Sequence, residues 1–206
     1  MKRFVVLVST VIASCADPSP TPAVDGGAGT LDAPIGTIDG PIATGDARPI
    51  DAGPPLTVDR ALCDAINAYR ADHGLAPVPV SAALTQVARF HVVDLTAHGT
   101  GAAGCNLHSW SVGDPRWTGC CYTADHAQAQ CMWRKPQEIA AYASSGYEIA
   151  AGGGGAITPS QAVSLWDGSS GHREVVLNAG QWASRTWRGM GCAIETGYAV
   201  VWFGER

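Results

Sequence analysis

The seven cysteines of this 206-residue chain constrain its fold more than any other feature. Met1–Ser14 has the composition of an export signal, and an exported chain reaches an oxidising compartment where disulfides persist. Six cysteines follow in the last 150 residues, an even number that allows 15 pairings. They are Cys63, Cys105, Cys120, Cys121, Cys131 and Cys192. We expect a disulfide-stabilised domain, with the neighbours Cys120 and Cys121 bonded to other partners. A zinc site formed by these cysteines is disfavoured, because the compartment is oxidising and no Cys-x-x-Cys pair occurs.

The N-terminus predicts a membrane anchor. Lys2 and Arg3 precede an apolar run, residues 4–12, that is too short to span a bilayer as a mature helix. Residues 12–15, Ile-Ala-Ser-Cys, resemble the bacterial lipobox, which implies cleavage before Cys15 and lipidation of that residue. Attached acyl chains would hold the protein at the cell envelope. Ala16 after Cys15 favours the outer membrane in a cell that has two membranes.

The composition changes at residue 57. Residues 16–56 contain eight Pro, seven Gly and six Asp, with no aromatic residue. Such a segment buries too little apolar surface to offset its ordering entropy, so residues 15–56 are predicted to be a disordered tether. The folded domain is predicted to cover residues 57–206. The chain carries 13 Lys and Arg against 18 Asp and Glu without a basic cluster, which argues against nucleic-acid binding.

Apolar periodicity and capping residues predict helices early in this domain. One is expected to run from Thr57 until just before Gly74, and a second from Ser81 to before His98-Gly99. His91 lies on the apolar face of the second helix and is interpreted as a buried, hydrogen-bonded histidine. Residues 99–137 are expected to be loop-rich and held by disulfides.

The second half of the domain predicts shorter elements. A short helix is expected at 136–142 and a loop at the four glycines 152–155. Thr158-Pro159-Ser160-Gln161 predicts the start of another helix, with Thr158 as the cap, Pro159 at the first helical position and Gln161 completing a capping box. Residues 188–195 and 198–203 flank Thr196-Gly197 and predict a β-hairpin.

The stretch Trp166–Arg173 contains the main candidate for a functional residue, His172. Its glycines predict a break between two short helices, and such a break can turn the ring of His172 toward a cleft. His108 and Glu148 are the other candidates for this cleft. Two imidazoles and a carboxylate can bind a divalent cation such as zinc.

The order of these features resembles the CAP superfamily, which comprises the cysteine-rich secretory proteins, antigen 5, the plant pathogenesis-related 1 proteins and bacterial SCP-type domains. The resemblance covers about residues 57–206 and is most specific at Trp166–Leu177, with the pattern Trp-x-x-Ser-x-Gly-His-Arg-x-x-x-Leu. Asn67-x-x-Arg70 and Gly189-x-Gly191 are similar to family positions too. The resemblance implies an α+β fold: an α-β-α sandwich with a small, mainly antiparallel sheet between helices.

The family often places two histidines and two acidic residues in one cleft. His108 and His172 match the two histidines, and Glu148 matches one acid after a shift of one residue. Without the shift, Tyr147 stands where the family has Glu. The second acid has no clear match, and Asp167 is the nearest candidate in sequence.

Two functions, and also a purely structural role as a buried polar network, are compatible with these residues. The first is a non-catalytic envelope lipoprotein whose cleft binds a ligand or partner, with a lipid or sterol suggested by the resemblance and a divalent metal as an option. The second is an envelope hydrolase that acts on peptide or peptidoglycan. Ser109 is a poor nucleophile candidate because it lies directly beside His108 and no nucleophile motif surrounds it. The sequence therefore favours binding, and no catalytic residue is assigned.

Overall fold

The computed structural model describes residues 57–206. The signal peptide (1–14), the lipidated Cys15 and the tether (15–56) that the sequence predicts lie outside the described residues. Within 57–206, no helix is both long and apolar enough to cross a bilayer. The elements, in chain order, are α1 (Thr57–Asp72), α2 (Ala82–His98), α3 (Ala129–Trp133), α4 (Lys135–Ala140), β1 (Gly146–Gly152), α5 (Pro159–Asp167), α6 (Ser170–Leu177), a 3₁₀ turn η1 (Gly180–Trp182), β2 (Gly189–Glu195) and β3 (Tyr198–Gly204).

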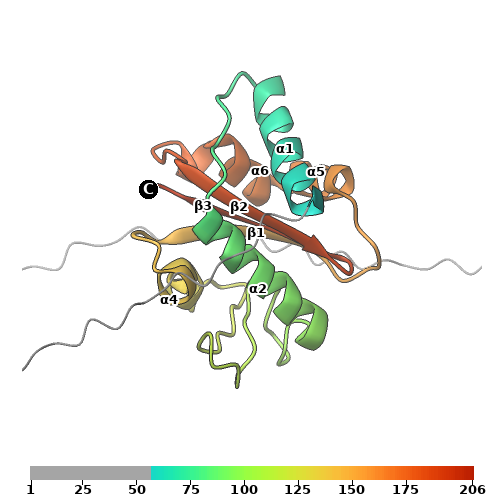
Figure 1. Ribbon diagram of the computed structural model, residues 1–206, viewed down its shortest axis with the longest axis vertical. Helices are drawn as coiled ribbons and strands as arrows, with labels where there is room; N and C mark the ends of the chain where they lie inside the picture. Colours follow the sequence, from blue (N-terminus) through green and yellow to red (C-terminus); the bar gives the residue numbers. More distant parts are fainter. Residues whose placement is uncertain (1–56) are drawn as a thin grey trace, which may run out of the picture.

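The three strands form one antiparallel sheet in the order β1-β3-β2. Helices α1, α5 and α6 cover one face of this sheet, and α2 and α4 cover the other (Figure 1). Alternate residues of β3 enter opposite layers: Val201 and Phe203 pack with the α1 side, whereas Val200 and Trp202 pack with the α2 side. The predicted α+β sandwich is confirmed.

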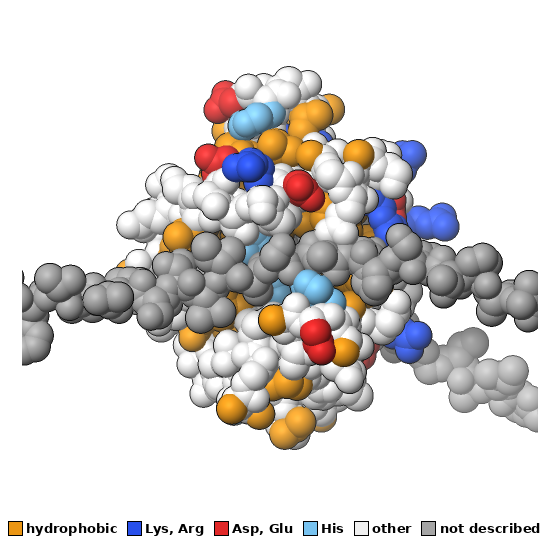
Figure 2. All heavy atoms as spheres, turned by 180° about the vertical axis from the view of Figure 1, so that it is seen from behind, with side chains coloured by type: hydrophobic (Ala, Val, Ile, Leu, Met, Phe, Trp, Pro, Cys, Tyr) orange, Lys and Arg blue, Asp and Glu red, His pale blue; other side chains and the backbone are white. Residues whose placement is uncertain are grey.

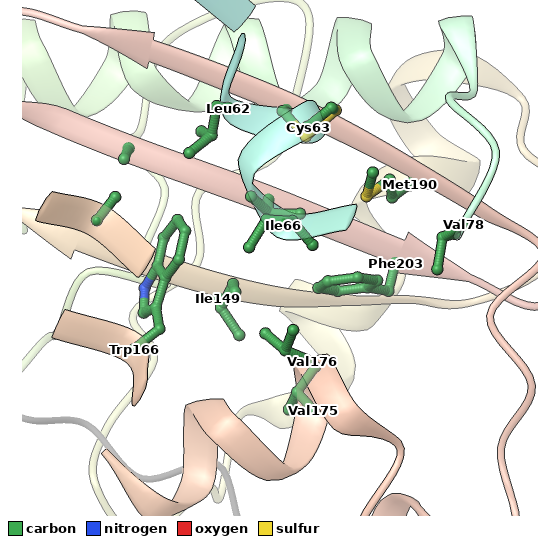
Figure 3. Packing of buried hydrophobic residues seen from close by; sticks show 14 of the residues in the cluster. Leu62, Cys63, Ile66, Val78, Ile149, Trp166, Val175, Val176, Met190 and Phe203 are labelled. Carbon is green, nitrogen blue, oxygen red and sulfur yellow. A yellow bond between two sulfur atoms is a disulfide. The ribbon is translucent and has the colours of Figure 1, made fainter. Parts of the chain in front are cut away.

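The layer of α1, α5 and α6 has an apolar core. Figure 3 shows Leu62 and Ile66 from α1, Trp166 from α5 and Val176 from α6 gathered over Ile149 of β1. All five side chains are buried. Burial of a large apolar side chain contributes about 1.5–3 kcal/mol, so this layer holds three separate helices on the sheet.

Local sequence signals place most helix starts as predicted. The Ser81 hydroxyl caps α2 by accepting from the backbone N–H of Leu84, and Thr158 and Gln161 form a capping box at α5. The hairpin of β2 and β3 is confirmed as well.

Three details differ from the predictions. Residues 146–152, at the start of the glycine-rich stretch, form the strand β1, which lacks the apolar–polar alternation of a half-exposed strand because both its faces are buried. The short helix α4 begins at Lys135 and ends at Ala140, slightly earlier than predicted. His172 lies just after a break at Gly168 and Ser169, as predicted, but it belongs to the first turn of α6 and is not lifted out of the helix.

The six cysteines of the described domain form three disulfides: Cys63–Cys192, Cys105–Cys121 and Cys120–Cys131. The first joins α1 to β2, and the other two lie in the segment between α2 and α4. The expectation of disulfides is confirmed, and the neighbours Cys120 and Cys121 have different partners as predicted.

Gly191 allows α2 to lie directly on β2. A Cβ atom at this position would be 2.0 Å from the carbonyl carbon of Leu84 and 2.1 Å from the backbone nitrogen of Thr85. These are backbone atoms of a packed helix and cannot move aside as a flexible side chain would. This close approach places the first turn of α2 directly on the sheet.

Candidate functional site

The site begins with Glu148 on β1. Its neighbours in the strand, Tyr147 and Ile149, belong to the core on the α1 side, and the alternation of a strand turns Glu148 to the α2 side. The carboxylate is completely buried there, with a side-chain exposure of 0%. A buried charge is tolerated only when it is paired and hydrogen-bonded.

Two histidines provide these partners. Nδ1 of His91, on α2, contacts Oε1 of Glu148, and Nδ1 of His108, in the loop after α2, lies 2.8 Å from Oε2. Both oxygens of one carboxylate are therefore engaged by imidazole nitrogens. Burial acts to raise the pKa of Glu148, but His91 and His108 together outweigh it and lower the pKa below the usual range. Glu148 is thus an ionised acceptor at neutral pH.

Hydrogen-bond chemistry then fixes where the ring protons lie. Nε2 of His91 is 2.9 Å from the backbone carbonyl of Ser109, and a carbonyl only accepts, so Nε2 donates. Because ionised Glu148 also only accepts, Nδ1 of His91 and Nδ1 of His108 both donate to it. The ring protons on Nδ1 of His91 and of His108 therefore point toward Glu148, and Nε2 of His108 lies on the side of its ring away from Glu148.

His172 lies beside His108, although it comes from α6 on the α1 side of the sheet. It projects from the first turn of α6, and its ring centroid lies 6.4 Å from that of His108, with the two rings nearly edge to face. The side chain is buried, and its Nε2 has no hydrogen-bond partner among residues 57–206. Burial lowers the pKa of His172 to about 3, His108 adds to this effect, and Glu148 opposes it. His172 is therefore a neutral, unsatisfied imidazole.

Aromatic side chains surround the two α2-side histidines. Trp110 stacks on His91 at 4.2 Å between ring centroids, and Tyr122 meets His108 edge to face at 5.2 Å. Lys135, also buried, lies over the ring of Trp110 and donates to Glu138 and to the carbonyl of Thr118. This packing holds the two rings in fixed orientations. Figure 2 shows histidine side chains near the middle of one face, with several Asp, Glu, Lys and Arg side chains elsewhere on that face.

Ser109 has a structural role. Its hydroxyl accepts from the backbone N–H of Tyr122 at 2.9 Å and contacts the Tyr122 carbonyl at 3.4 Å, and the residue is buried. Asp167, the other acid considered from the sequence, accepts from the hydroxyl of Tyr69 on α1. Neither side chain is directed to the histidine pair.

The residues fit a metal ion only in part. Two imidazoles bound to one tetrahedral zinc through bonds of about 2.0–2.1 Å have ring centroids roughly 5 Å apart. The rings of His108 and His172 are farther apart than this, so they would have to approach each other. Glu148 could become a ligand only by giving up a histidine, and within 57–206 no three His, Cys, Asp or Glu side chains are grouped to hold a metal. Glu148 is better placed to orient His108 behind a metal than to bind one.

The structure thus brings together His108, Glu148 and His172, the three residues that the sequence singled out, and adds His91. The sequence interpretation of His91 as buried and hydrogen-bonded is confirmed, but its partnership with Glu148 was missed. The only available signal was a histidine at a core position, where a polar ring needs partners.

The family model for the cysteine-rich secretory protein family, CAP, matches residues 63–203, more than half of the chain. The chain therefore belongs to this family. No curated protein is significantly similar to the sequence.

Solved structures give distant similarities. An outer surface protein from Borrelia burgdorferi is 21% identical, with a TM-score of 0.47 over 71% of this chain and 91% of that protein. A cysteine-rich secretory protein from Staphylococcus aureus is 15% identical, with a TM-score of 0.45 over 72% of this chain and 38% of that one. An extracellular protein containing an SCP domain from Bacillus anthracis is 18% identical, with a TM-score of 0.48 over 75% and 45%. This chain thus spans less than half of the latter two proteins.

Proposed function

We propose that this chain is an exported, lipid-anchored bacterial envelope protein whose domain binds a ligand, without catalysing a reaction, in a proposed cleft between His108 and His172. One observation carries the proposal. The two rings come from opposite layers of the sandwich, and the buried Nε2 of His172 has no partner within the described domain. A buried polar atom without a partner costs about 1–3 kcal/mol, so a ligand that supplies a partner gains binding energy there.

The chemistry of the cleft favours binding over catalysis. Glu148 uses both oxygens to hold histidines, and the Ser109 hydroxyl is engaged with the backbone of Tyr122. A hydrolase would need a nucleophile or an activated water beside a base. The residues that remain are the imidazoles of His108 and His172 beside aromatic side chains, which suit an apolar ligand with a polar end, such as a lipid or sterol, or a weakly held divalent metal.

The location rests on the sequence before residue 57. The lipobox-like residues Ile12–Cys15 support lipidation at Cys15 and attachment to the envelope membrane, the outer one in a cell with two membranes. Expression with an alkyne-labelled fatty acid tests this directly. We expect label in the wild-type protein and none in Cys15→Ala, and label retained in Cys15→Ala would remove the proposed anchor site.

Binding is tested with the exported chain, residues 16–206, and vesicles of phosphatidylethanolamine and phosphatidylglycerol that contain a tritiated sterol or fatty acid. We expect saturable uptake, reduced about tenfold or more in His172→Phe because the substitution fills the cleft and removes Nε2. His98→Phe, at the exposed end of α2, is the matched control and should bind as the wild type does. Absence of saturable uptake by the wild-type protein would refute lipid binding. Zinc is titrated separately by calorimetry.

A peptide or peptidoglycan hydrolase remains the second candidate, since a neutral imidazole in a cleft can act as a base. It is distinguished by incubating the protein with peptidoglycan and with casein. Hydrolysis that disappears in the double variant His108→Ala, His172→Ala would favour this function over pure binding.

A further inference from the structure

The segment that precedes His108, residues 99–105, is attached to the rest of the domain mainly by the Cys105–Cys121 disulfide. Residues 101–104, which precede Cys105, are exposed, and the segment includes three glycines between 99 and 104. Its backbone hydrogen bonds are local, from Gly101 N–H to His98 and from Cys105 N–H to Ala102. The first backbone bond to a distant residue is from Asn106 N–H to the Tyr122 carbonyl, at 2.9 Å. The Cys105–Cys121 bond therefore anchors this approach to the cleft.

The three disulfides differ in how accessible they are. Cys63 and Cys192 are 2% and 0% exposed, inside the core of the α1 layer. Cys120 is also buried, although its partner Cys131 is only half-buried. Cys121 is exposed and Cys105 is half-buried, so this pair is the most accessible of the three. A thiolate must reach a sulfur atom to break a disulfide, and access therefore sets the order of reduction.

We propose that Cys105–Cys121 is a reducible staple that controls the His108 side of the cleft, and that its partner is a dithiol reductant, such as a dithiol–disulfide oxidoreductase of the envelope. A thiolate of the dithiol attacks one sulfur and forms a mixed disulfide, which the second thiol of the reductant resolves. The cysteine pair gains two electrons and two protons and becomes two thiols, and the dithiol becomes a disulfide.

Reduction loosens the cleft through Asn106. Its side-chain oxygen accepts from the backbone N–H of His108 at 3.0 Å, and its carbonyl accepts from the N–H of Ser109 at 3.0 Å. Asn106 is next to Cys105, so freeing Cys105 removes the covalent support of the residue that positions His108.

The rest of the domain keeps its own supports. Trp110 and Cys120 exchange two backbone hydrogen bonds, of 2.7 and 2.9 Å, and Cys120 remains bonded to Cys131. The buried Cys63–Cys192 bond continues to join α1 to β2. Reduction of the staple is therefore a local change. This inference goes beyond the proposed function and holds whether or not the cleft binds lipid.

The test is graded reduction of the exported chain, residues 16–206, with dithiothreitol, followed by alkylation and mass spectrometry of the six cysteines. We expect Cys105 and Cys121 to be alkylated about ten times faster or more than Cys63 and Cys192, because only the first pair is accessible. Equal rates for these two pairs, or earlier reduction of Cys63–Cys192, would overturn the proposal.

Hydrogen exchange then tests the link to the cleft. After selective reduction, the amides of residues 105–109 should exchange about tenfold faster or more, with α1 and β2 unchanged. The double variant Cys105→Ser, Cys121→Ser should reproduce this pattern, and Cys120→Ser, Cys131→Ser should instead increase exchange around α3. If the serine variants fail to fold, the selectively reduced wild-type protein gives the same readout. Unchanged exchange at 105–109 would contradict control of His108 by the staple.

Discussion

Glu148→Gln is expected to lower the free energy of unfolding by about 3–5 kcal/mol, the loss typical of breaking a buried ion pair from one side. The substitution changes size very little. It removes the negative charge between His91 and His108 and replaces one accepting oxygen by an N–H group, which faces a donating ring nitrogen. The two buried ring nitrogens that donated to the carboxylate then face a neutral amide.

Urea unfolding at pH 7, followed by tryptophan fluorescence, measures this effect. Glu195→Gln at the exposed end of β2 is the matched control and should change the free energy by less than about 0.5 kcal/mol. If Glu148→Gln is as stable as this control, the carboxylate does not hold the two rings as described.

Stability is also expected to decline as the pH falls from about 6.5, at a rate of about 1.4 kcal/mol per pH unit from His172 alone. The pKa of His172 is lowered to about 3 in the folded protein and returns to about 6.5 on unfolding. Between these values the unfolded chain binds one proton more than the folded chain, so stability rises with pH there and is fully present above about 6.5.

The pH range 5–6.5 isolates this contribution. The lowered pKa of Glu148 gives stability that is present above its unfolded value of about 4.3 and is lost only as the pH falls through the lower folded pKa. Urea unfolding at several pH values in this range should show a slope smaller by about 1.4 kcal/mol per unit in His172→Asn than in the wild type. His98→Asn should keep the wild-type slope, and equal slopes in all three proteins would show that His172 titrates normally.

Local sequence signals were sufficient for much of the sandwich. The cap at Ser81, the capping box at Thr158 and the hairpin turn at Thr196-Gly197 act within a few residues, and each element begins or turns where they indicate. The strand β1 gave no such signal. Tyr147 and Ile149 face one core, Glu148 and Ala150 face the other, and no face is left for the polar residues that mark a half-exposed strand.

The sequence was sufficient to name His108, Glu148 and His172 as site residues, but only partly to predict which of them contact each other. A resemblance to family motifs pointed to His108 and His172, and a carboxylate was expected beside them. The role of Glu148 depends on His91, which is 57 residues earlier in the chain and belongs to the apolar stripe of α2. Only the close contact of α2 with the sheet brings these side chains together. Disulfide partners are likewise set by tertiary proximity rather than by spacing.

This arrangement also accounts for a departure from the family pattern. Without the one-residue shift, Tyr147 would stand where the family has its acid, but its ring packs against Trp182 and Trp187 in the α1-side core, with Arg185 over it. Glu148, one residue later, faces the α2 side and can reach both His91 and His108. A carboxylate at position 147 would instead face the α1-side core, away from both histidines.

Ring nitrogen NMR of the histidines, measured at pH 5 and pH 7, tests the central claim most directly: Glu148 orients His108, and His172 is left neutral toward the cleft. We expect a proton on Nδ1 of both His91 and His108 at pH 7, and a neutral His172 at both pH values. A proton on Nε2 of a neutral His108 at pH 7, or a His172 that is protonated at pH 5, would contradict it.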